Sequence, residues 1–264
     1  MKLKIARRST QILTIAMMFI VPLLNKREIN LINGTLYSFN IGPISVTDPL
    51  SGLQTLILTL NLSAAFIISI LIPIAAAFIF GRVFCGWMCP QNTLSEITDF
   101  ITEKLGIKRF SKGALSPIPR YIVLGALLIM TPILGFPAAN LISAPGILSV
   151  QSSRLVSEGS VGIDLALIGI ILVLEAFIIR RIWCNNICPI GGLLGIFRTK
   201  KTMKVVFKED EGHICGGCLE CARSCRLGLN PVEGRVYPLC HNCGDCIEAC
   251  DGITKEKRPL SFRF

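Results

Sequence analysis

The sequence is poor in charge and in histidine. Only 17% of its residues are charged, 52% are hydrophobic, and the mean hydropathy is +0.62. That composition is too apolar for an ordinary soluble domain and indicates a membrane protein. The two histidines, His213 and His241, both lie near the C-terminus, outside the long apolar segments. A b-type haem within a membrane needs a pair of histidine ligands there. We therefore expect no haem, which excludes a cytochrome b subunit.

Apolar runs with few or no charged residues predict four transmembrane helices. Residues 53–80 and 121–144 contain no charged residue, and residues 161–179 contain only Asp164 and Glu175. A helix needs about 20 apolar residues to cross the hydrocarbon core. The first run, residues 9–24, is shorter and follows the basic stretch KLKIARR, as a signal peptide does. No small-x-small cleavage site follows it, so we interpret it as a retained span.

The distribution of basic residues predicts the orientation. Of the 27 Lys and Arg residues, all but Lys26, Arg27 and Arg154 fall in segments that four spans would place on one side. The positive-inside rule makes that side cytoplasmic and puts both termini there, at a prokaryotic inner membrane. The formal charge of +10 then reflects topology and attraction to anionic lipid. No basic stripe with interleaved aromatic residues is present, so we expect no nucleic-acid partner.

The apolar part contains an internal repeat. Cys85, Cys89 and Pro90 recur as Cys184, Cys188 and Pro189 at an offset of 99 residues, and Arg82 likewise recurs as Arg181. Each C-x3-C-P motif follows a predicted helical hairpin of the same topology. We therefore predict a four-helix bundle built from two hairpins in a parallel pseudo-repeat, which brings both motifs together.

Three interpretations of these four cysteines stay open. Cys85, Cys89, Cys184 and Cys188 hold a third iron–sulfur cluster or another thiophilic metal, act as two redox dithiols, or are inert buried thiols. All twelve cysteines lie on the predicted reducing side, which disfavours disulfides. A cysteine before a helix-initiating proline and near an arginine predicts a depressed thiol pKa. Residues 91–106 predict an amphipathic helix along the inner surface.

The C-terminal segment predicts a second domain. The sequence turns polar near Lys200, so we divide the chain into a membrane domain, 1–200, and a cytoplasmic α+β domain, 201–264. The latter contains C-x2-C-x2-C-x3-C twice, the spacing of bacterial two-cluster ferredoxins, in which the fourth cysteine of each run ligates the other cluster. This assigns Cys215, Cys218, Cys221 and Cys250 to one [4Fe-4S] cluster, and Cys240, Cys243, Cys246 and Cys225 to the other. Zinc would leave the middle cysteines of each run unexplained. His241 is interpreted as a packing or hydrogen-bonding residue.

Two acidic residues interrupt the last apolar run. A carboxylate within a bilayer costs roughly 3 kcal/mol or more, which makes it a functional candidate. Glu175 is the deeper of the two, and it either pairs with Arg180 or Arg181 or accepts protons from a quinol. Asp164 is nearer the outer end, where we expect it to be solvated or to act as a helix N-terminal charge.

Together these features resemble the NapH/MauN family of ferredoxin-type membrane proteins, with a more distant likeness to NosR and CcoG. The segment DPLSGLQ, residues 48–54, also looks like that family's outer loop. The resemblance covers nearly the whole chain. It implies a quinol dehydrogenase subunit of a multi-subunit oxidoreductase in anaerobic respiration. Such a subunit oxidises menaquinol or ubiquinol from the membrane pool and passes electrons through iron–sulfur clusters to an iron–sulfur partner and a terminal oxidoreductase.

Two other functions stay open. In a CcoG-like assembly factor, the C-x3-C-P cysteines would handle copper and the clusters would supply electrons. In a non-catalytic role, the chain would be a membrane anchor and electron conduit without a quinol site of its own.

Overall fold

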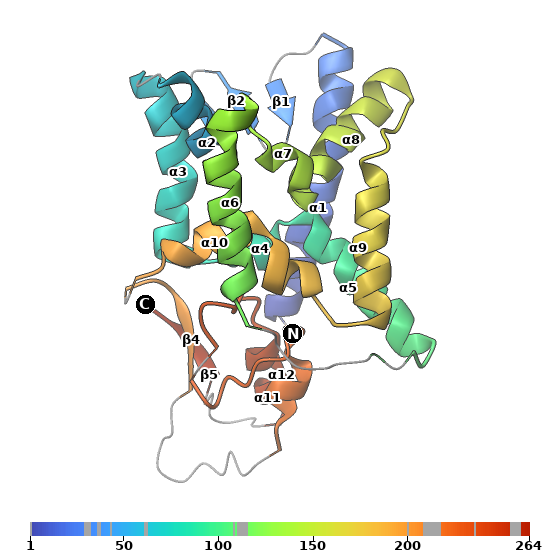
Figure 1. Cartoon of the computed structure of the whole chain (residues 1–264). Helices are drawn as coiled ribbons and strands as arrows, with labels where there is room; N and C mark the ends of the chain where they lie inside the picture. Colours follow the sequence, from blue (N-terminus) through green and yellow to red (C-terminus); the bar gives the residue numbers. More distant parts are fainter. Residues whose placement is uncertain are drawn as a thin grey trace.

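The computed structural model describes residues 2–28, 33–35, 38–42, 44–60, 63–107, 109, 116–199, 201–207, 218–234, 236–253 and 260–264. Its elements are mostly helices (Figure 1). They are α1 (Lys2–Lys26), β1 (Asn33–Thr35), β2 (Ser38–Ile41), β3 (Ile44–Thr47), α2 (Pro49–Thr59), α3 (Ala64–Phe80), α4 (Val83–Trp87), α5 (Pro90–Lys104), α6 (Ile118–Leu134), α7 (Ala139–Ile142), α8 (Ala144–Glu158), α9 (Leu165–Phe177), the π-helix η1 (Trp183–Ile187), α10 (Pro189–Ile196), β4 (Lys204–Phe207), α11 (Glu220–Ser224), α12 (Asp245–Ile253) and β5 (Leu260–Arg263).

Four longer apolar helices, α1, α3, α6 and α9, form the upper part of the molecule in Figure 1. Within the described residues, only Leu3–Lys26 has the length and composition to cross a membrane; Ala64–Phe80, Ile118–Leu134 and Leu165–Phe177 are shorter apolar helices. The first helix is therefore longer than the expected residues 9–24, and the other three are shorter than expected. A mostly helical fold is confirmed, whereas the four-span bundle stays a prediction.

Local backbone signals explain the shorter helices. Residues 53–80 were expected as one span, but Leu60 adopts a left-handed conformation (φ 49°) that ends α2 before α3 begins. Residues 121–144 are likewise divided, because Gly135 ends α6 in the left-handed region that glycine tolerates best. Then Ser143 caps α8, accepting a hydrogen bond from the Gly146 amide. Apolar length alone did not reveal these breaks.

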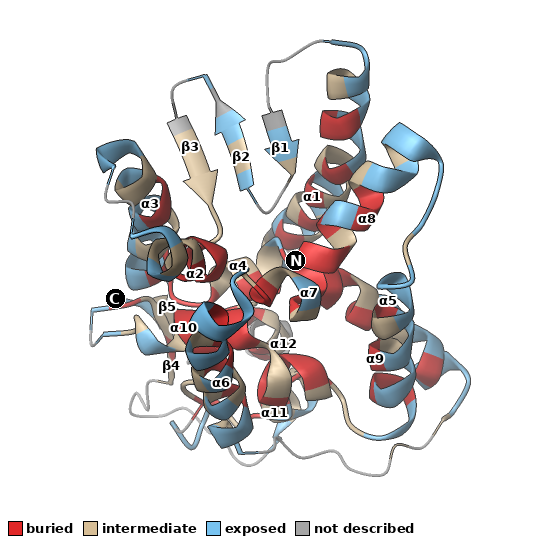
Figure 2. Cartoon of the chain, turned by 45° about the horizontal axis from the view of Figure 1, so that its top comes forward, coloured by how far each residue is buried: buried red, intermediate tan, exposed pale blue. Residues whose placement is uncertain are grey.

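The DPLSGLQ segment is the start of α2, and the expectation that it is an outer loop is wrong. Asp48 caps the helix by accepting hydrogen bonds from the amides of Leu50 and Ser51. Leu50 and Gln54 are fully buried, and the Gln54 Nε2 group donates to Thr131 Oγ1 of α6 at 2.7 Å. Figure 2 shows buried residues concentrated where α2, α7, α8 and α10 meet. This short helix therefore belongs to the core.

A small sheet covers the end of the bundle that lies away from the C-terminal segment. Strands β1, β2 and β3 are antiparallel in that order, with Phe39 opposite Val46. Strand β3 packs against α3, and α8 packs along α1. The sheet thereby covers one end of the space between α3 and its neighbours.

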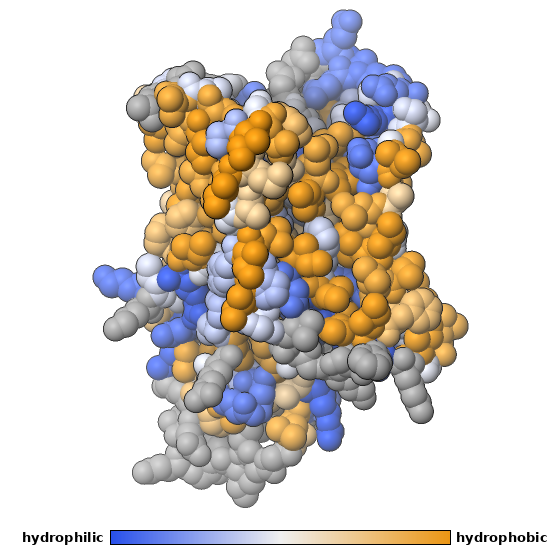
Figure 3. All heavy atoms as spheres, in the orientation of Figure 1, coloured by the Kyte–Doolittle hydropathy of each residue, from blue (hydrophilic) through white to orange (hydrophobic). Residues whose placement is uncertain are grey.

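The C-terminal segment docks against the opposite end. Strands β4 and β5 form an antiparallel pair, and α11 packs on α12. The Met203 amide donates to the Ile79 carbonyl at 2.9 Å, and the Asn242 Nδ2 group donates to the Phe80 carbonyl at 3.0 Å. Figure 3 shows hydrophobic residues over the helical part and hydrophilic ones around this segment. The two parts are thus joined at the C-terminal end of α3.

Candidate functional site

The two C-x3-C-P motifs have matching backbone geometry. In each, the amide of the second cysteine donates to the carbonyl of the residue before the first cysteine: Cys89 to Phe84 and Cys188 to Trp183, both at 2.9 Å. Cys89 and Cys188 each occupy the N-cap of the following helix, with proline at the first position. This confirms the predicted helix starts. Proline suits that position because it has a fixed φ and no amide hydrogen to leave unpaired.

The structure brings the four motif cysteines together. Cys85 and Cys188 lie close enough to Cys89 to influence its ionisation, and Cys188 and Cys89 lie close enough to influence that of Cys184. Cys85, Cys89 and Cys184 are buried, and Cys188 packs against the same apolar core as Cys85. The convergence expected from the repeat is therefore present. Among the described residues, however, no three His, Cys, Asp or Glu side chains stand close enough to hold one metal ion.

Three of the motif cysteines, Cys89, Cys184 and Cys188, do not have the depressed pKa values expected from the motif. Burial raises the pKa of the Cys188 thiol to about 11; the nearby Cys85 adds to the effect, and the Gly191 amide and Arg82 oppose it. Burial likewise raises the pKa values of Cys89 and Cys184. The prediction failed because loss of solvent outweighs the nearby positive charge. Free thiolates are thus disfavoured unless a cation compensates them.

The repeated arginines take different partners. Arg82 is buried and its NH1 group donates to the carbonyls of Pro238 and Leu239, both at 3.0 Å. Arg181 is buried too, but its NH1 group donates to the Asn92 side chain at 2.8 Å, and its NH2 group pairs with Asp99 at 3.3 Å. One arginine therefore fixes the C-terminal segment, and the other fixes α5.

Helix α5 is amphipathic, but its polar face points inward. Its buried polar residues are Gln91, Asn92, Thr93, Ser95, Glu96, Asp99 and Thr102. Ile97, Phe100 and Ile101 of the same helix are exposed. The amphipathic pattern is visible in the sequence, but a pattern alone does not reveal that the polar face lies against protein.

That inward face forms a buried ion network that sequence reasoning missed. Glu96 Oε2 lies 2.9 Å from Arg8 NH1, and the Glu96 side chain also approaches Arg7 and Arg226. Arg7 and Arg226 in turn pair with Asp245 at 2.9 and 3.1 Å. Burial raises the pKa of Glu96, but these arginines outweigh it and hold that pKa below the ordinary 4.5. The network ties α1 and α5 to the segment that carries the ferredoxin-type cysteines.

Some of the C-terminal cysteines lie close together in the structure. A small enclosed cavity is lined by Cys225, Cys240, Cys243 and Cys246, the set predicted for one cluster, together with apolar residues and His241. Cys221 and Cys250 of the other set pack in one core with Cys246, whereas Cys218 is exposed. Cys215 lies outside the described residues. The second predicted set thus surrounds a common space with thiols, the donors that iron–sulfur clusters require.

The motif site touches this cysteine loop directly. A Cβ placed on Gly86, which lies within the first motif, would be 2.9 Å from the His241 carbonyl oxygen and 3.4 Å from Cys243 Cβ. The Trp87 Nε1 group donates to the Asn242 carbonyl at 3.1 Å. Burial lowers the pKa of His241, and Arg82, Arg181 and Arg120 add to that effect. Because no side chain separates Gly86 from the loop, the two cysteine groups are close neighbours.

Glu175 lies beside the second motif. It is 2% exposed, and its charge acts on Cys184; Arg181 and Ser95 are near its carboxylate. Arg180 and Arg181 form their ion pairs with Asp99 and Glu103, and among the described residues neither forms an ion pair with Glu175. Asp164 is exposed at the N-cap of α9, as expected.

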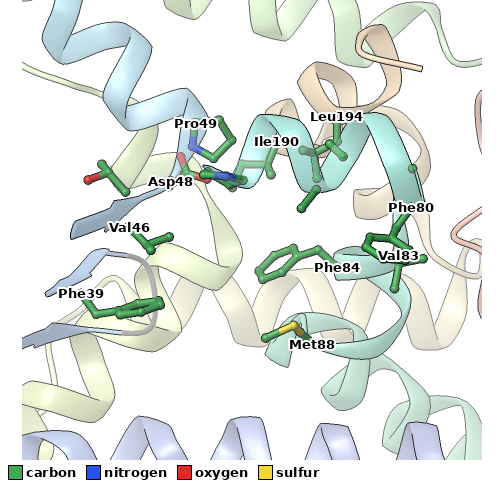
Figure 4. A pocket seen from close by; sticks show the side chains of 15 residues that line it. Phe39, Val46, Asp48, Pro49, Phe80, Val83, Phe84, Met88, Ile190 and Leu194 are labelled. Carbon is green, nitrogen blue, oxygen red and sulfur yellow. The ribbon is translucent and has the colours of Figure 1, made fainter. Parts of the chain in front are cut away.

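A separate apolar cavity of about 320 Å³ borders the first motif. Its walls come from the sheet, α3, α4 and α10, and its lining includes Phe84, Met88 and Ile190 (Figure 4). The sequence did not predict this cavity, because its lining residues are spread over six elements, β2, β3, α2, α3, α4 and α10, and most carry no chemical signature.

Comparison with known protein families finds two matching segments, which coincide with the two copies of the internal repeat. A family of 4Fe-4S binding domains matches residues 62–108 and 161–205, two segments that begin 99 residues apart and contain one C-x3-C-P motif each. The ferredoxin-type protein NapH of Escherichia coli is 26% identical over 224 residues, 78% of this chain and 72% of that protein. The methylamine utilization ferredoxin-type protein MauN of Methylorubrum extorquens is 29% identical over 221 residues, 83% of this chain and 73% of MauN.

A third relative extends the similarity to archaea. An uncharacterized protein of Methanocaldococcus jannaschii is 32% identical over 200 residues, 75% of this chain and 71% of that protein. No solved structure matches this chain.

Proposed function

Because the chain belongs to the NapH/MauN family of ferredoxin-type electron-transfer proteins, we propose that it is a membrane subunit that oxidises quinol. It passes the electrons through iron–sulfur clusters to an iron–sulfur partner and a terminal oxidoreductase. The observation that carries this proposal is the contact between the two cysteine groups: Gly86 of the first motif packs against His241 and Cys243 of the tail. Electron carriers held at these two places would be neighbours.

Three centres would make up the path. We assign one [4Fe-4S] cluster to Cys225, Cys240, Cys243 and Cys246, which line one cavity, and a second to Cys215, Cys218, Cys221 and Cys250. A third centre would be held by Cys85, Cys89, Cys184 and Cys188. The donor set fits, because iron–sulfur clusters are bound by cysteine thiolates, and a bound cluster supplies one-electron transfer. We also propose that the tail, 201–264, is the ferredoxin-like unit.

Burial favours a resident centre over the other interpretations of the motif cysteines. Redox dithiols and metal-exchange sites need accessible thiolates. Here three of the four thiols are buried, and burial raises the pKa values of Cys89, Cys184 and Cys188. Bound iron would compensate the thiolates. Copper bound by the same cysteines in the purified protein would instead support the assembly-factor function.

We further propose that α1, α3, α6 and α9 are the four spans, with both termini in the cytoplasm. At 1.5 Å per residue, the 17-residue helices α3 and α6 cover roughly 25 Å and the 13-residue α9 roughly 20 Å, compared with about 30 Å for the hydrocarbon core. Exposed side chains such as Ile122, Ile129 and Ile133 on α6 face outward, as lipid-facing residues do. Reporter fusions at the two termini and at residue 159 would test this topology, with the last expected outside.

Quinol-driven reduction tests the electron-transfer proposal. The full chain, purified without oxygen and placed in lipid nanodiscs, is mixed with reduced menaquinone, and cluster reduction is followed by visible absorbance and EPR. We expect reduction within seconds. Protein that carries its clusters, is reduced by dithionite, and is not reduced by either menaquinol or ubiquinol would contradict quinol oxidation and favour the anchor function.

Proton uptake has two candidate carboxylates. Glu175 is the residue proposed from sequence, and it neighbours Cys184. Asp48 is the carboxylate that lines the apolar cavity. Replacing Glu175 by Gln removes its proton-accepting ability with little change in shape, so a slowed quinol reaction with intact clusters is the result expected if Glu175 accepts the proton.

A further inference from the structure

The apolar cavity beside the first motif has the size of a small-ligand site. Its volume of about 320 Å³ lies at the lower end of the range for ligand pockets, roughly 300–1,000 Å³. In Figure 4, Phe84 points from α4 toward the side of the cavity that holds Val46 and Phe39 of the sheet. Pro73, Ala76 and Ala77 of α3 form another wall. The space is sufficient for a ring system but not for a long prenyl chain.

The chemistry of the lining favours a flat ring with polar substituents over a lipid acyl chain. Three aromatic side chains, Phe39, Phe80 and Phe84, line the cavity. Aromatic rings stack favourably on other rings. Thr47 at the end of β3 adds a hydroxyl group, and Asp48 at the start of α2 adds a carboxylate. An acyl chain would offer these polar groups no hydrogen-bond partner, whereas a hydroquinone has two hydroxyl groups to present to them.

The cavity also adjoins both cysteine motifs. Phe84 and Met88 directly precede Cys85 and Cys89, and Ile190 follows Cys188 by two residues. A ring held there would be a neighbour of the four-cysteine site. This placement is what an electron donor to that site requires.

We propose that this cavity binds the ring of the quinol, with Asp48 as the residue that accepts its protons; the inference rests on the proposed function. The bound hydroquinone loses two electrons, one at a time, and both hydroxyl O–H bonds break to give the quinone. Cys85, Cys89, Cys184 and Cys188 would hold the centre that takes up these electrons, and the cysteines of the tail would hold the clusters that accept them in turn. Asp48 takes each proton in turn and releases it to water on the sheet side.

Asp48 is positioned for that role by the start of α2. Its Oδ2 atom accepts hydrogen bonds from the amides of Leu50 and Ser51 at 3.0 and 2.8 Å, which fixes the carboxylate at the cavity. The residue is only partly buried, so water can reach it. Glu175 is not among the lining residues, although it neighbours Cys184. The geometry therefore favours Asp48 over Glu175 as the proton acceptor.

A labelling experiment tests the location. The probe is a photoreactive azido-quinone, added to the full chain in nanodiscs, with the labelled peptides identified by mass spectrometry. We expect labelling of peptides from α3 and α4, with a loss of at least 80% in excess menaquinone. An Ala76→Phe substitution fills the cavity and should weaken probe binding about tenfold. Ala75→Phe is the matched control, because Ala75 is also exposed on α3 but does not line the cavity.

The outcomes separate this inference from the proposed function. Competed labelling around Glu175 instead of the cavity, together with rapid cluster reduction, overturns the location and leaves quinol oxidation standing. Cavity labelling that excess menaquinone does not displace, as expected for an acyl-chain pocket, overturns the inference as well. Competed cavity labelling in protein whose clusters quinol does not reduce supports the binding site but contradicts the proposed function.

A second variant tests the proton acceptor. Asp48→Asn keeps an oxygen that can accept the two amide hydrogen bonds but removes the carboxylate. We expect probe labelling to be unchanged and quinol-driven reduction to slow about 100-fold, within the range that general bases contribute. Reduction by dithionite should stay normal. An unchanged quinol reaction in Asp48→Asn, with slowing only in Glu175→Gln, would overturn the role of Asp48.

Discussion

The two halves of the repeat share their cysteine geometry and differ in almost everything around it. Cys89 and Cys188 donate to equivalent carbonyls at the same 2.9 Å distance and cap equivalent helices. Yet the first motif packs against the tail loop, whereas the second borders Glu175; the apolar cavity adjoins both motifs. The helix after the first motif buries a polar face, whereas α10 is short, apolar and rich in glycine.

This difference distinguishes the ligand geometry that a centre shared by the two motifs would need from the contacts that each half of the repeat makes around it. A site built from both motifs needs four equivalent ligands, so their backbone geometry is the same in both halves. The residues around the two motifs do not bind the centre, so they need not be equivalent. The first half makes contact with the tail, and the second half provides ion pairs that hold α5; residues of both halves line the apolar cavity.

The largest expected contrast is between the paired arginines. Replacing Arg82 by Met leaves the buried Pro238 and Leu239 carbonyls without their donor, which we expect to cost about 3 kcal/mol and to release the tail. Replacing Arg181 by Met should cost less, because Asp99 keeps Arg109 at 2.7 Å. Limited proteolysis near residue 200 measures tail release. Equal protease sensitivity of the two variants would contradict the proposed difference between the halves.

The ion network of the first half should give a smaller, pH-dependent effect. In Glu96→Gln, the surrounding arginines lose their common counter-charge, so we expect a loss of about 2 kcal/mol at pH 7. Because folding lowers the Glu96 pKa below 4.5, its contribution is present above that pH and is lost as the pH falls through the folded value. Thermal unfolding followed by helical circular dichroism should therefore show the two proteins converging below pH 4.5. A gap that stays constant down to pH 3 would contradict this explanation.

The smallest expected contrast lies within α10. A Cβ on Gly191 would be 2.5 Å from Arg82 NH2, a side chain held by two carbonyls, whereas on Gly192 it would be an ordinary 3.4 Å from the Arg120 carbonyl. Gly191→Ala should therefore lower stability by about 1 kcal/mol, whereas Gly192→Ala should be neutral or slightly stabilising because alanine favours helices. Thermal midpoints of the two variants measure this directly. Stabilisation of Gly191→Ala would show that Arg82 is not held in place.

Much of the site could be predicted, because it depends on the spacing of cysteine and proline residues along the sequence. The C-x3-C-P motifs, their helix starts and their convergence follow from repeated residues a fixed distance apart, and the 4Fe-4S domain matches fall on the same two segments. The set Cys225, Cys240, Cys243 and Cys246 also lines one cavity. Family membership could be predicted for the same reason, since it depends on motif order along the chain.

Features that depend on burial could not be predicted. The breaks at Leu60 and Gly135 divide apolar runs that composition makes continuous. The pKa values of the Cys89, Cys184 and Cys188 thiols rise because packing removes water, which no local pattern reports. The inward polar face of α5 and the cavity both arise from contacts between segments far apart in the chain, such as Glu96 with Arg226.

Iron and sulfide analysis of anaerobically purified protein tests the central claim, that the two motifs form one iron–sulfur centre. With four irons in each of three clusters, we expect about twelve irons per wild-type chain. Cys85→Ser and Cys184→Ser should each contain about eight, lose the same EPR signal and keep the signals of the tail clusters. About eight irons in the wild type, unchanged in both variants, would contradict a shared centre.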